Sequence, residues 1–259
     1  MQVTPVAIPN EGFAQKLEAA IPYGNGPDAY ISSHDKVGDY VRRDLVAALD
    51  DGEGGVDPTA FLPATVAPLR LGGKLHGVPL AFKSIALFYR TDALTGPPAT
   101  TADLVRVCRE FNQKRNTPVE PCLVYETGSF FFHAAWLHGF GGRIFDGDGP
   151  DASPRLTTPE GERAMKFLRA LVDDRVVPDE VTGTTTTQMF NDGRVAMAIN
   201  GPWFIGEIAP GVPYRVAPLP TVSETGKPAA PLLTIEAGML SPRAKSRAAT
   251  VGFLAWLAG

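Results

Sequence analysis

Short apolar runs alternate with amphipathic stretches along this chain from end to end, and this pattern limits the fold more than any other feature. Strands are predicted in six such runs, at 3–8, 28–32, 74–80, 86–90, 121–125 and 195–199. Helices are predicted in five segments, over 11–21, 101–112, 158–172 and 185–191 and in a last one that begins at Ser241-Pro242. This alternation predicts an α/β fold, with helices layered on sheets.

The segment 158–172 has the clearest helix signal. Thr158 is suited to the N-cap because its hydroxyl can accept a hydrogen bond from a free backbone N–H group. Pro159 follows at the first helical position, where the missing N–H group has no consequence. Phe167, Leu168 and Leu171 give the helix one apolar face, which we expect to be buried.

Size and charge exclude several function classes. With 259 residues the chain suits two lobes of ordinary domain size. Its formal net charge is -4 and its basic residues are scattered, so it lacks the basic stripe of a nucleic-acid-binding protein. No apolar stretch is long enough to span a membrane. No basic and then apolar leader follows Met1, so we expect no signal peptide in this chain.

The chain has two cysteines, Cys108 and Cys122. In an oxidising compartment they could form one disulfide. We favour the simpler interpretation that both are small, buried, unbonded apolar residues.

Known catalytic patterns are missing from the sequence. It contains no glycine-rich phosphate loop, no Gly-x-Ser-x-Gly turn and no His-Glu-x-x-His motif. The loop 146–151 is rich in Asp and Gly but lacks the closing bidentate acid of a calcium loop, so we expect a solvated turn. The sequence therefore predicts no catalytic residue, no metal and no cofactor.

Aromatic residues stand near the ends of two predicted strands. Trp203 closes the segment Asn200-Gly201-Pro202-Trp203, directly after the strand 195–199. Open α/β sheets bind ligands at the carboxyl ends of their strands, so Trp203 is as well placed for ligand contact as for the core. The aromatic block 130–132, taken alone, is more typical of core packing.

Several segments resemble the maltose/maltodextrin-binding protein family, which serves ABC sugar importers. They are Gly26-Pro27-Asp28, the stretch 33–38 (SHDKVG), the stretch 73–79 (GKLHGVP), Thr158-Pro159-Glu160-Gly161, the stretch 190–203 and the stretch 237–242. Because they occur in order over the whole chain, the resemblance is more specific than any one motif. It implies a periplasmic-binding-protein-like fold of two α/β lobes joined by hinge strands, with elements missing at both termini.

The resemblance also implies a division of the chain. The first lobe would comprise 1–82 plus 235–259 and the second 86–231, with hinges near 82–85 and 231–234. The lobes would close around a maltose- or maltodextrin-type oligosaccharide and deliver it to the transmembrane subunits of an ABC transporter, in the periplasm or another extracytoplasmic place.

Ligand-binding residues follow from the resemblance by position. Asp35 and Lys36 of the first lobe would hydrogen-bond to sugar hydroxyls. Phe131 and Trp203 of the second lobe would stack on sugar rings, with Phe132 beside them.

Five positions differ from the family pattern. Lys83 and Ser129 stand at two ligand-site positions where the family has acids, and Ser32 replaces an aromatic residue. Phe131 replaces a stacking tyrosine, and Lys36 replaces an arginine and so lacks its two-pronged geometry. These changes remove several acceptors for sugar hydroxyls.

Three hypotheses remain open at this point. The first is sugar capture for import. The second is a sugar-sensing or permease-fused binding domain with altered or weak specificity. Such a domain could be part of a larger transporter polypeptide, because the family's first strand and helix and its closing helices are not found in this sequence. Either the run 3–8 takes the place of the missing strand, or another segment or chain completes the first lobe. The third is a glycosidase that uses Glu126 with Asp146 or Asp148, which the sequence disfavours because no pairing of these acids can be argued.

Overall fold

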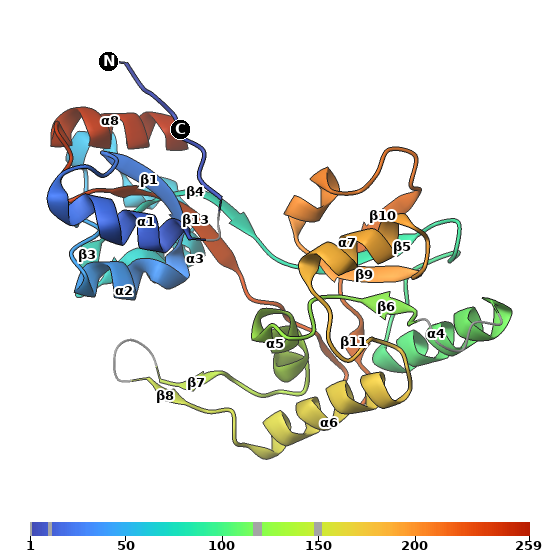
Figure 1. Ribbon diagram of the computed structural model, residues 1–259. Helices are drawn as coiled ribbons and strands as arrows, with labels where there is room; N and C mark the ends of the chain where they lie inside the picture. Colours follow the sequence, from blue (N-terminus) through green and yellow to red (C-terminus); the bar gives the residue numbers. More distant parts are fainter. Residues whose placement is uncertain (1, 10–11, 116–120, 148–151) are drawn as a thin grey trace. The chain divides into compact units, whose positions relative to one another are not determined.

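The computed structural model describes residues 2–9, 12–115, 121–147 and 152–259 (Figure 1). The chain divides into two compact units, one of residues 1–83 and 233–259 and the other of residues 84–232. The chain passes from one unit to the other twice, and both passages lie near the ends of paired strands. We describe each unit by itself.

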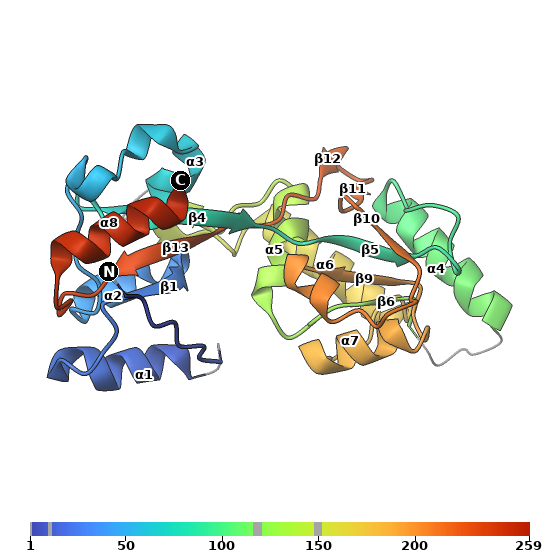
Figure 2. The same cartoon turned by 90° about the horizontal axis from the view of Figure 1, so that it is seen from above.

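The first unit holds a small sheet with helices around it. Its elements are α1 (Phe13–Ala20), β1 (Ala29–Ser33), α2 (Val37–Arg42), α3 (Pro63–Val66), β2 (Arg70–Leu71), β3 (Lys74–Leu75), β4 (Val78–Lys83), β13 (Thr234–Leu240) and α8 (Arg247–Ala258). The main sheet has the order β1-β13-β4 and is antiparallel throughout, so β13 is its central strand (Figure 2). Leu17 of α1, Tyr40 of α2 and Leu254 of α8 pack into one apolar core with Ile235 and Met239 of β13.

Two predictions for the first unit are wrong. Residues 3–8 form no strand, and their side chains are mostly exposed, with Val6 at 75%. Pro5 within this run and Pro9 directly after it have no backbone N–H group to donate to a neighbouring strand. A strand-like composition also does not ensure that a partner strand lies beside the run. The last helix begins after Ser246, not at Ser241, because β13 runs to Leu240 and Ser241 continues directly from it.

The second unit is the larger. Its elements are β5 (Ala86–Arg90), α4 (Thr101–Arg115), β6 (Leu123–Val124), α5 (Phe130–Gly139), β7 (Phe145–Asp146), β8 (Ser153–Pro154), α6 (Pro159–Asp173), α7 (Gly183–Asn191), β9 (Met197–Asn200), β10 (Tyr214–Ala217), β11 (Thr221–Val222) and β12 (Lys227–Pro228). Its main sheet has the order β10-β5-β9-β6, antiparallel except for the parallel pair β6 and β9.

Helices cover both faces of this sheet, which explains why β5, β6 and β9 are mostly buried, whereas the edge strand β10 contains Arg215 and is partly exposed. Leu87 of β5 belongs to the core under α4, α5 and α6, whereas its neighbour Phe88 belongs to the core under α7. Figure 1 shows α7 on one side of the sheet and α5 and α6 on the other. The alternation follows from the two-residue period of a strand.

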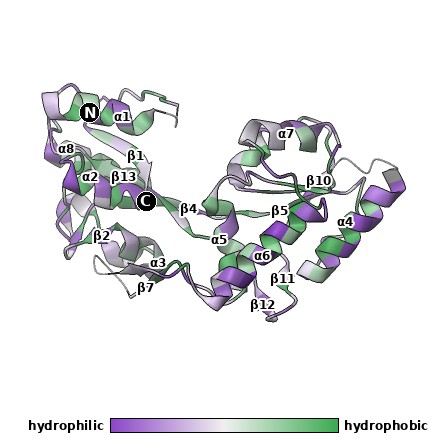
Figure 3. Ribbon diagram, turned by 60° about the horizontal axis from the view of Figure 1, so that its bottom comes forward, coloured by the Kyte–Doolittle hydropathy of each residue, from purple (hydrophilic) through white to green (hydrophobic). Residues whose placement is uncertain are grey.

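The helix predicted from Thr158 is confirmed. The Thr158 hydroxyl accepts a hydrogen bond from the Gly161 N–H at 3.2 Å, and α6 starts at Pro159. Leu168 and Leu171 are buried in the core and Phe167 packs against it. Hydrophilic and hydrophobic residues alternate along α6 and α4 in Figure 3, as a helix with one buried face requires.

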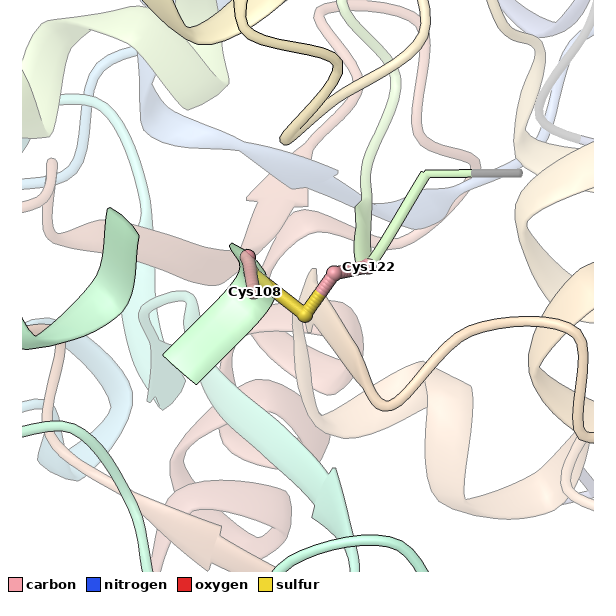
Figure 4. Close-up of a disulfide and its surroundings, with 2 residues drawn as sticks. All are labelled: Cys108 and Cys122. Carbon is pink, nitrogen blue, oxygen red and sulfur yellow. A yellow bond between two sulfur atoms is a disulfide. The ribbon is translucent and has the colours of Figure 1, made fainter. Parts of the chain in front are cut away.

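The interpretation of the cysteines as unbonded is wrong. Cys108 on α4 and Cys122 just before β6 form a disulfide, with their Cα atoms 5.1 Å apart (Figure 4). Both side chains are fully buried, as expected of a structural bridge. The fold brings the two residues together by packing α4 against β6, a contact that the spacing of 14 residues does not reveal.

Candidate functional site

The predicted site residues fall into two groups, one in each unit. The first group lies where β1 ends, at the short 3-10 turn His34–Lys36. The Ser33 hydroxyl donates a hydrogen bond to the Asp35 carboxylate, and Lys36 forms an ion pair with the same carboxylate, Nζ to Oδ2, at 3.2 Å. Burial raises the pKa of Asp35, but the hydroxyl and the ammonium outweigh it and hold that pKa below its usual value.

His34 connects this turn to the central strand. The Ile235 N–H donates a hydrogen bond to His34 Nδ1 at 3.1 Å, which requires that nitrogen to be unprotonated. Burial lowers the pKa of His34, although Asp35 and Glu236 favour its charged form. The imidazole is therefore held in its neutral state, as an acceptor.

Lys83 joins the same group through the sheet register. β13 places Glu236 opposite Ser33 on one side and opposite Ala81 on the other. Lys83 Nζ lies 2.5 Å from Glu236 Oε1 in an ion pair, and the two side chains are 30% and 26% exposed. The carboxylate next to Lys83 thus comes from a neighbouring strand.

The second group is built around Trp203. β9 ends at Asn200, and the 3-10 turn Pro202–Gly206 follows after Gly201. A Cβ atom at Gly201 would lie 2.1 Å from Cη2 of Trp203, far closer than any real contact, so only glycine lets the indole ring lie over the backbone there. Trp203 remains 40% exposed, which leaves part of the ring surface open to a ligand.

The aromatic block 130–132 opens α5 and divides between core and surface. Phe132 is buried in the core, and Phe131 packs against it edge-on at a centroid distance of 5.5 Å. Phe131 also faces Trp203, with the ring centroids 6.5 Å apart and tilted by 40°. Ser129 is the N-cap residue of α5, and its side chain makes no capping hydrogen bond. The structure therefore brings Phe131 and Trp203 together, with Ser129 at the same helix end as Phe131.

A pocket of about 620 Å³ lies beside Trp203, entirely within the second unit. It is lined by Glu126, Phe132, Gly183, Thr184, Thr186, Thr187, Gln188, Asn200, Trp203 and Glu207. Two site residues from the sequence analysis, Phe132 and Trp203, line it. The remaining lining is rich in hydroxyl and carboxylate oxygens, which suit a polar ligand.

Four of the residues around these groups were missed as binding candidates: Glu236, Thr186, Thr187 and Glu207. Glu236 becomes visible only through the register of β13, and the α7 threonines only when α7 is packed near Trp203. Thr182 and the threonine run after it indicate an N-cap, and Thr182 does accept a hydrogen bond from the Thr185 N–H. That signal concerns helix formation and carries no sign of a pocket.

The glycosidase pairing receives no support from this geometry. Asp146 forms an ion pair with Arg155, Nη1 to Oδ1, at 2.6 Å, while Glu126 lines the pocket beside Trp203. Asp148 and most of the loop 146–151 lie outside the described residues. Within the described ranges, no group of three or more His, Cys, Asp or Glu side chains could hold a metal ion.

The chain has hydrogen-bonding side chains in one unit and, in the other, a partly exposed aromatic ring beside a pocket that contains hydroxyl and carboxylate groups. These are features of a solute-binding protein. The chain belongs to the family of bacterial extracellular solute-binding proteins, whose sequence pattern matches residues 1–259. This membership confirms the resemblance found in the motifs and places the chain in a binding class, not an enzyme class.

Individual relatives are distant and longer. A protein of Pyrococcus abyssi named maltotriose-binding protein is 28% identical over 212 residues, which are 82% of this chain and 46% of that protein. Maltodextrin-binding protein MdxE of Bacillus subtilis is 23% identical over 233 residues, or 84% of this chain and 54% of that protein. A maltooligosaccharide ABC transporter solute-binding lipoprotein of Streptococcus pneumoniae is 25% identical over 220 residues, or 82% and 51%.

The chain thus spans about half the length of the curated relatives it matches. Among the described helices, none combines the length and the apolar character that a membrane span requires.

Proposed function

We propose that this chain binds a maltose- or maltodextrin-type oligosaccharide and hands it to the membrane subunits of an ABC importer. The observation that carries the proposal is Trp203, which is 40% exposed, lies over Gly201 and stands beside Phe131 and a pocket that contains hydroxyl and carboxylate groups. Sugars have apolar C–H faces and polar hydroxyl rims. A ring surface next to hydroxyl and carboxylate oxygens suits both.

The names of the relatives support the ligand class. Three of them are named for binding maltotriose, maltodextrin or maltooligosaccharides. In this chain Asp35 and Lys36 would contribute hydrogen bonds from the first unit, while Phe131 and Trp203 would contribute ring stacking from the second. Phe132 would support them from the core.

Closure is the second part of the proposal. The segments 82–85 and 231–234 would act as hinges around which the units move when ligand binds. Within the first unit Lys83 pairs with Thr234, and within the second the Ser84 hydroxyl donates to the Leu232 carbonyl at 3.0 Å. The two strands therefore run as a pair up to the change of unit, which would let them bend together.

The family supports a place of action outside the cytoplasm. We propose that the chain works outside the cytoplasm, next to the transmembrane subunits that receive the sugar. Its partners would be those subunits and the oligosaccharide, either as a separate receptor or as part of a larger transporter polypeptide.

Two residues support the alternative hypothesis that the chain is a sensing or permease-fused domain with altered specificity. Lys83 is engaged by Glu236, and Ser129 presents a hydroxyl where the family resemblance leads us to expect an acid. Both substitutions reduce the number of open carboxylate acceptors for sugar hydroxyls, which favours weaker or different binding.

The test is calorimetric titration of the full chain with maltose, maltotriose and a longer maltodextrin, with tryptophan fluorescence followed in parallel. We expect saturable binding, and we expect Trp203→Ala to weaken it by about 30-fold or more, the size of an aromatic hot-spot loss. Trp256→Ala is the matched control, because Trp256 lies exposed on α8 of the first unit. Absence of binding to all three sugars, or equal losses in both variants, would refute the proposal.

A further inference from the structure

The pocket beside Trp203 is acidic. Its charged lining residues are Glu126 and Glu207, and within the described part of the chain neither lysine nor arginine lines it. Both side chains are exposed and carry a negative charge at neutral pH. A ligand group that enters this pocket therefore meets two carboxylates with no compensating cation in the wall.

The two carboxylates are only partly occupied by the protein. Thr187 donates its hydroxyl hydrogen to Glu207 Oε2 at 2.5 Å, and no hydrogen bond from the described residues reaches the other oxygen of that carboxylate. Glu126 Oε2 lies near the first residue of α7, 3.4 Å from where a Cβ atom on Gly183 would stand. No hydrogen bond or ion pair among the described residues reaches the Glu126 carboxylate. The helix N-terminus favours a negative charge at that place even without a cation.

A second observation indicates a ligand here. Thr186, on the first turn of α7, lines the same pocket and is only 1% exposed. Its hydroxyl oxygen is buried and has no hydrogen-bond partner among the described residues. Buried polar groups in native proteins are nearly always paired, so an unpaired hydroxyl on a residue that lines a pocket points to a partner that the protein itself does not supply, either an ordered water or a ligand.

We propose that this pocket selects the ligand by charge: it takes a neutral or amino-bearing sugar unit next to the ring on Trp203 and rejects a unit that carries a carboxylate. The inference rests on the proposed sugar binding. Sugar hydroxyls and ammonium groups donate hydrogen bonds to Glu126, Glu207 and Thr186, whereas a uronate brings a third negative charge into the same space.

The experiment compares three matched probes by calorimetry at neutral pH and low salt. They are maltotriose, its analogue with a 6-carboxylate in place of one terminal 6-hydroxymethyl group, and the corresponding 6-amino analogue. For the wild-type chain we expect the carboxylate analogue to bind at least about tenfold more weakly than maltotriose (about 1.4 kcal/mol), and the amino analogue as tightly or more tightly. The difference should shrink at high salt, because it is electrostatic.

Substitutions then locate the effect. Glu126→Gln with Glu207→Gln keeps the shape and removes both charges, so the ratio between the neutral and the acidic probe should fall to within about twofold. Glu110→Gln on α4, which lies outside the pocket, is the matched control and should leave the ratio unchanged.

Thr186→Val provides a readout that a purely structural role would not produce. Removing an unpaired buried hydroxyl should maintain or raise the melting temperature of the ligand-free chain. The same change should weaken maltotriose binding by several-fold, because the ligand loses that partner. A variant with a lower melting temperature and unchanged affinity would contradict the assignment of Thr186.

The outcomes separate this inference from the function beneath it. Binding of maltotriose with no preference among the three probes, or a preference that survives the double Gln variant, would overturn charge selection and leave sugar binding in place. Failure of all three probes to bind would overturn both.

Discussion

The two groups of predicted ligand residues are built in opposite ways. In the first unit the charges are paired within the protein: Asp35 with Lys36, and Lys83 with Glu236. In the second unit an aromatic ring is open to solvent and the Glu126 carboxylate has no described partner. A ligand that binds the first group must exchange with existing ion pairs, whereas the second group offers a partly exposed ring and a carboxylate with no described hydrogen bond or ion pair. We therefore expect the second unit to supply most of the binding free energy and the first to supply orientation.

The largest expected effect tests whether the two units are stabilised independently. Replacing Cys108 and Cys122 by alanine should lower the free energy of unfolding of the second unit by about 3 kcal/mol, the value for a bridge that closes a loop of this length. Native-state hydrogen exchange measures it. Amides of α4 and β6 should lose protection, while those of β13 in the first unit should keep theirs. Equal losses in both units would show that the comparison is wrong and that they unfold as one.

The next effect tests the assignment of binding free energy to the second unit. Gly201→Ala introduces a Cβ atom where the Trp203 ring now lies, so the ring must move. We expect maltotriose affinity to fall by about tenfold, with a shift of tryptophan emission in the ligand-free chain. Gly206→Ala is the matched control, because a Cβ atom there meets nothing within 4 Å.

A smaller effect is expected at the first group. Lys83→Met removes the cation that engages Glu236 and leaves the carboxylate to accept from a sugar hydroxyl. Maltose affinity should rise by about threefold, and the stability of the chain should change by no more than about 1 kcal/mol, as for a partly exposed ion pair. A fall in affinity would mean that Lys83 itself contacts the ligand.

The smallest effect is a pH dependence of stability. Burial lowers the pKa of His34, so the unfolded chain binds a proton at this residue more readily than the folded chain does. The contribution of His34 is present above the pKa of an unfolded histidine and is lost as pH falls from there through the lowered value. His34→Gln keeps a hydrogen-bond acceptor for the Ile235 N–H and should flatten this part of the profile in chemical denaturation between pH 7 and pH 5. An unchanged profile would exclude His34, and leave His76 and His133, whose pKa values burial also lowers, as the titrating groups.

Local signals explain which elements could be predicted. α6 follows from Thr158 and Pro159, since a cap and a fixed φ act within one turn. β5 occupies the predicted run 86–90 because the apolar stretch 86–89 suits a strand covered on both faces. The run 3–8 has a strand-like composition as well, but pairing depends on a partner strand that composition does not specify.

The site shows the same division. Trp203 could be proposed as a ligand contact because it follows a buried strand, and open sheets bind ligands at strand ends. Glu236 could not be found, because it reaches Lys83 only through the antiparallel register of β13. The disulfide was missed for a related reason, since the approach of Cys108 to Cys122 depends on the packing of a helix against a strand.

The order of the chain has a consequence for biosynthesis. The second unit is one continuous segment, 84–232, whereas the first needs β13, which follows that whole segment. Domains fold in order from the N-terminal side during synthesis. Residues 84–232 can therefore fold before β13 is made, while β1 and β4 still lack the strand that pairs with both of them. Until β13 has been synthesised, β1 and β4 expose backbone N–H and C=O groups that have no partner strand. Such edges are prone to aggregation and need protection, for example by chaperones. Slow translation of residues 234–240 should therefore lower the yield of folded protein more than slow translation of any strand within residues 84–232.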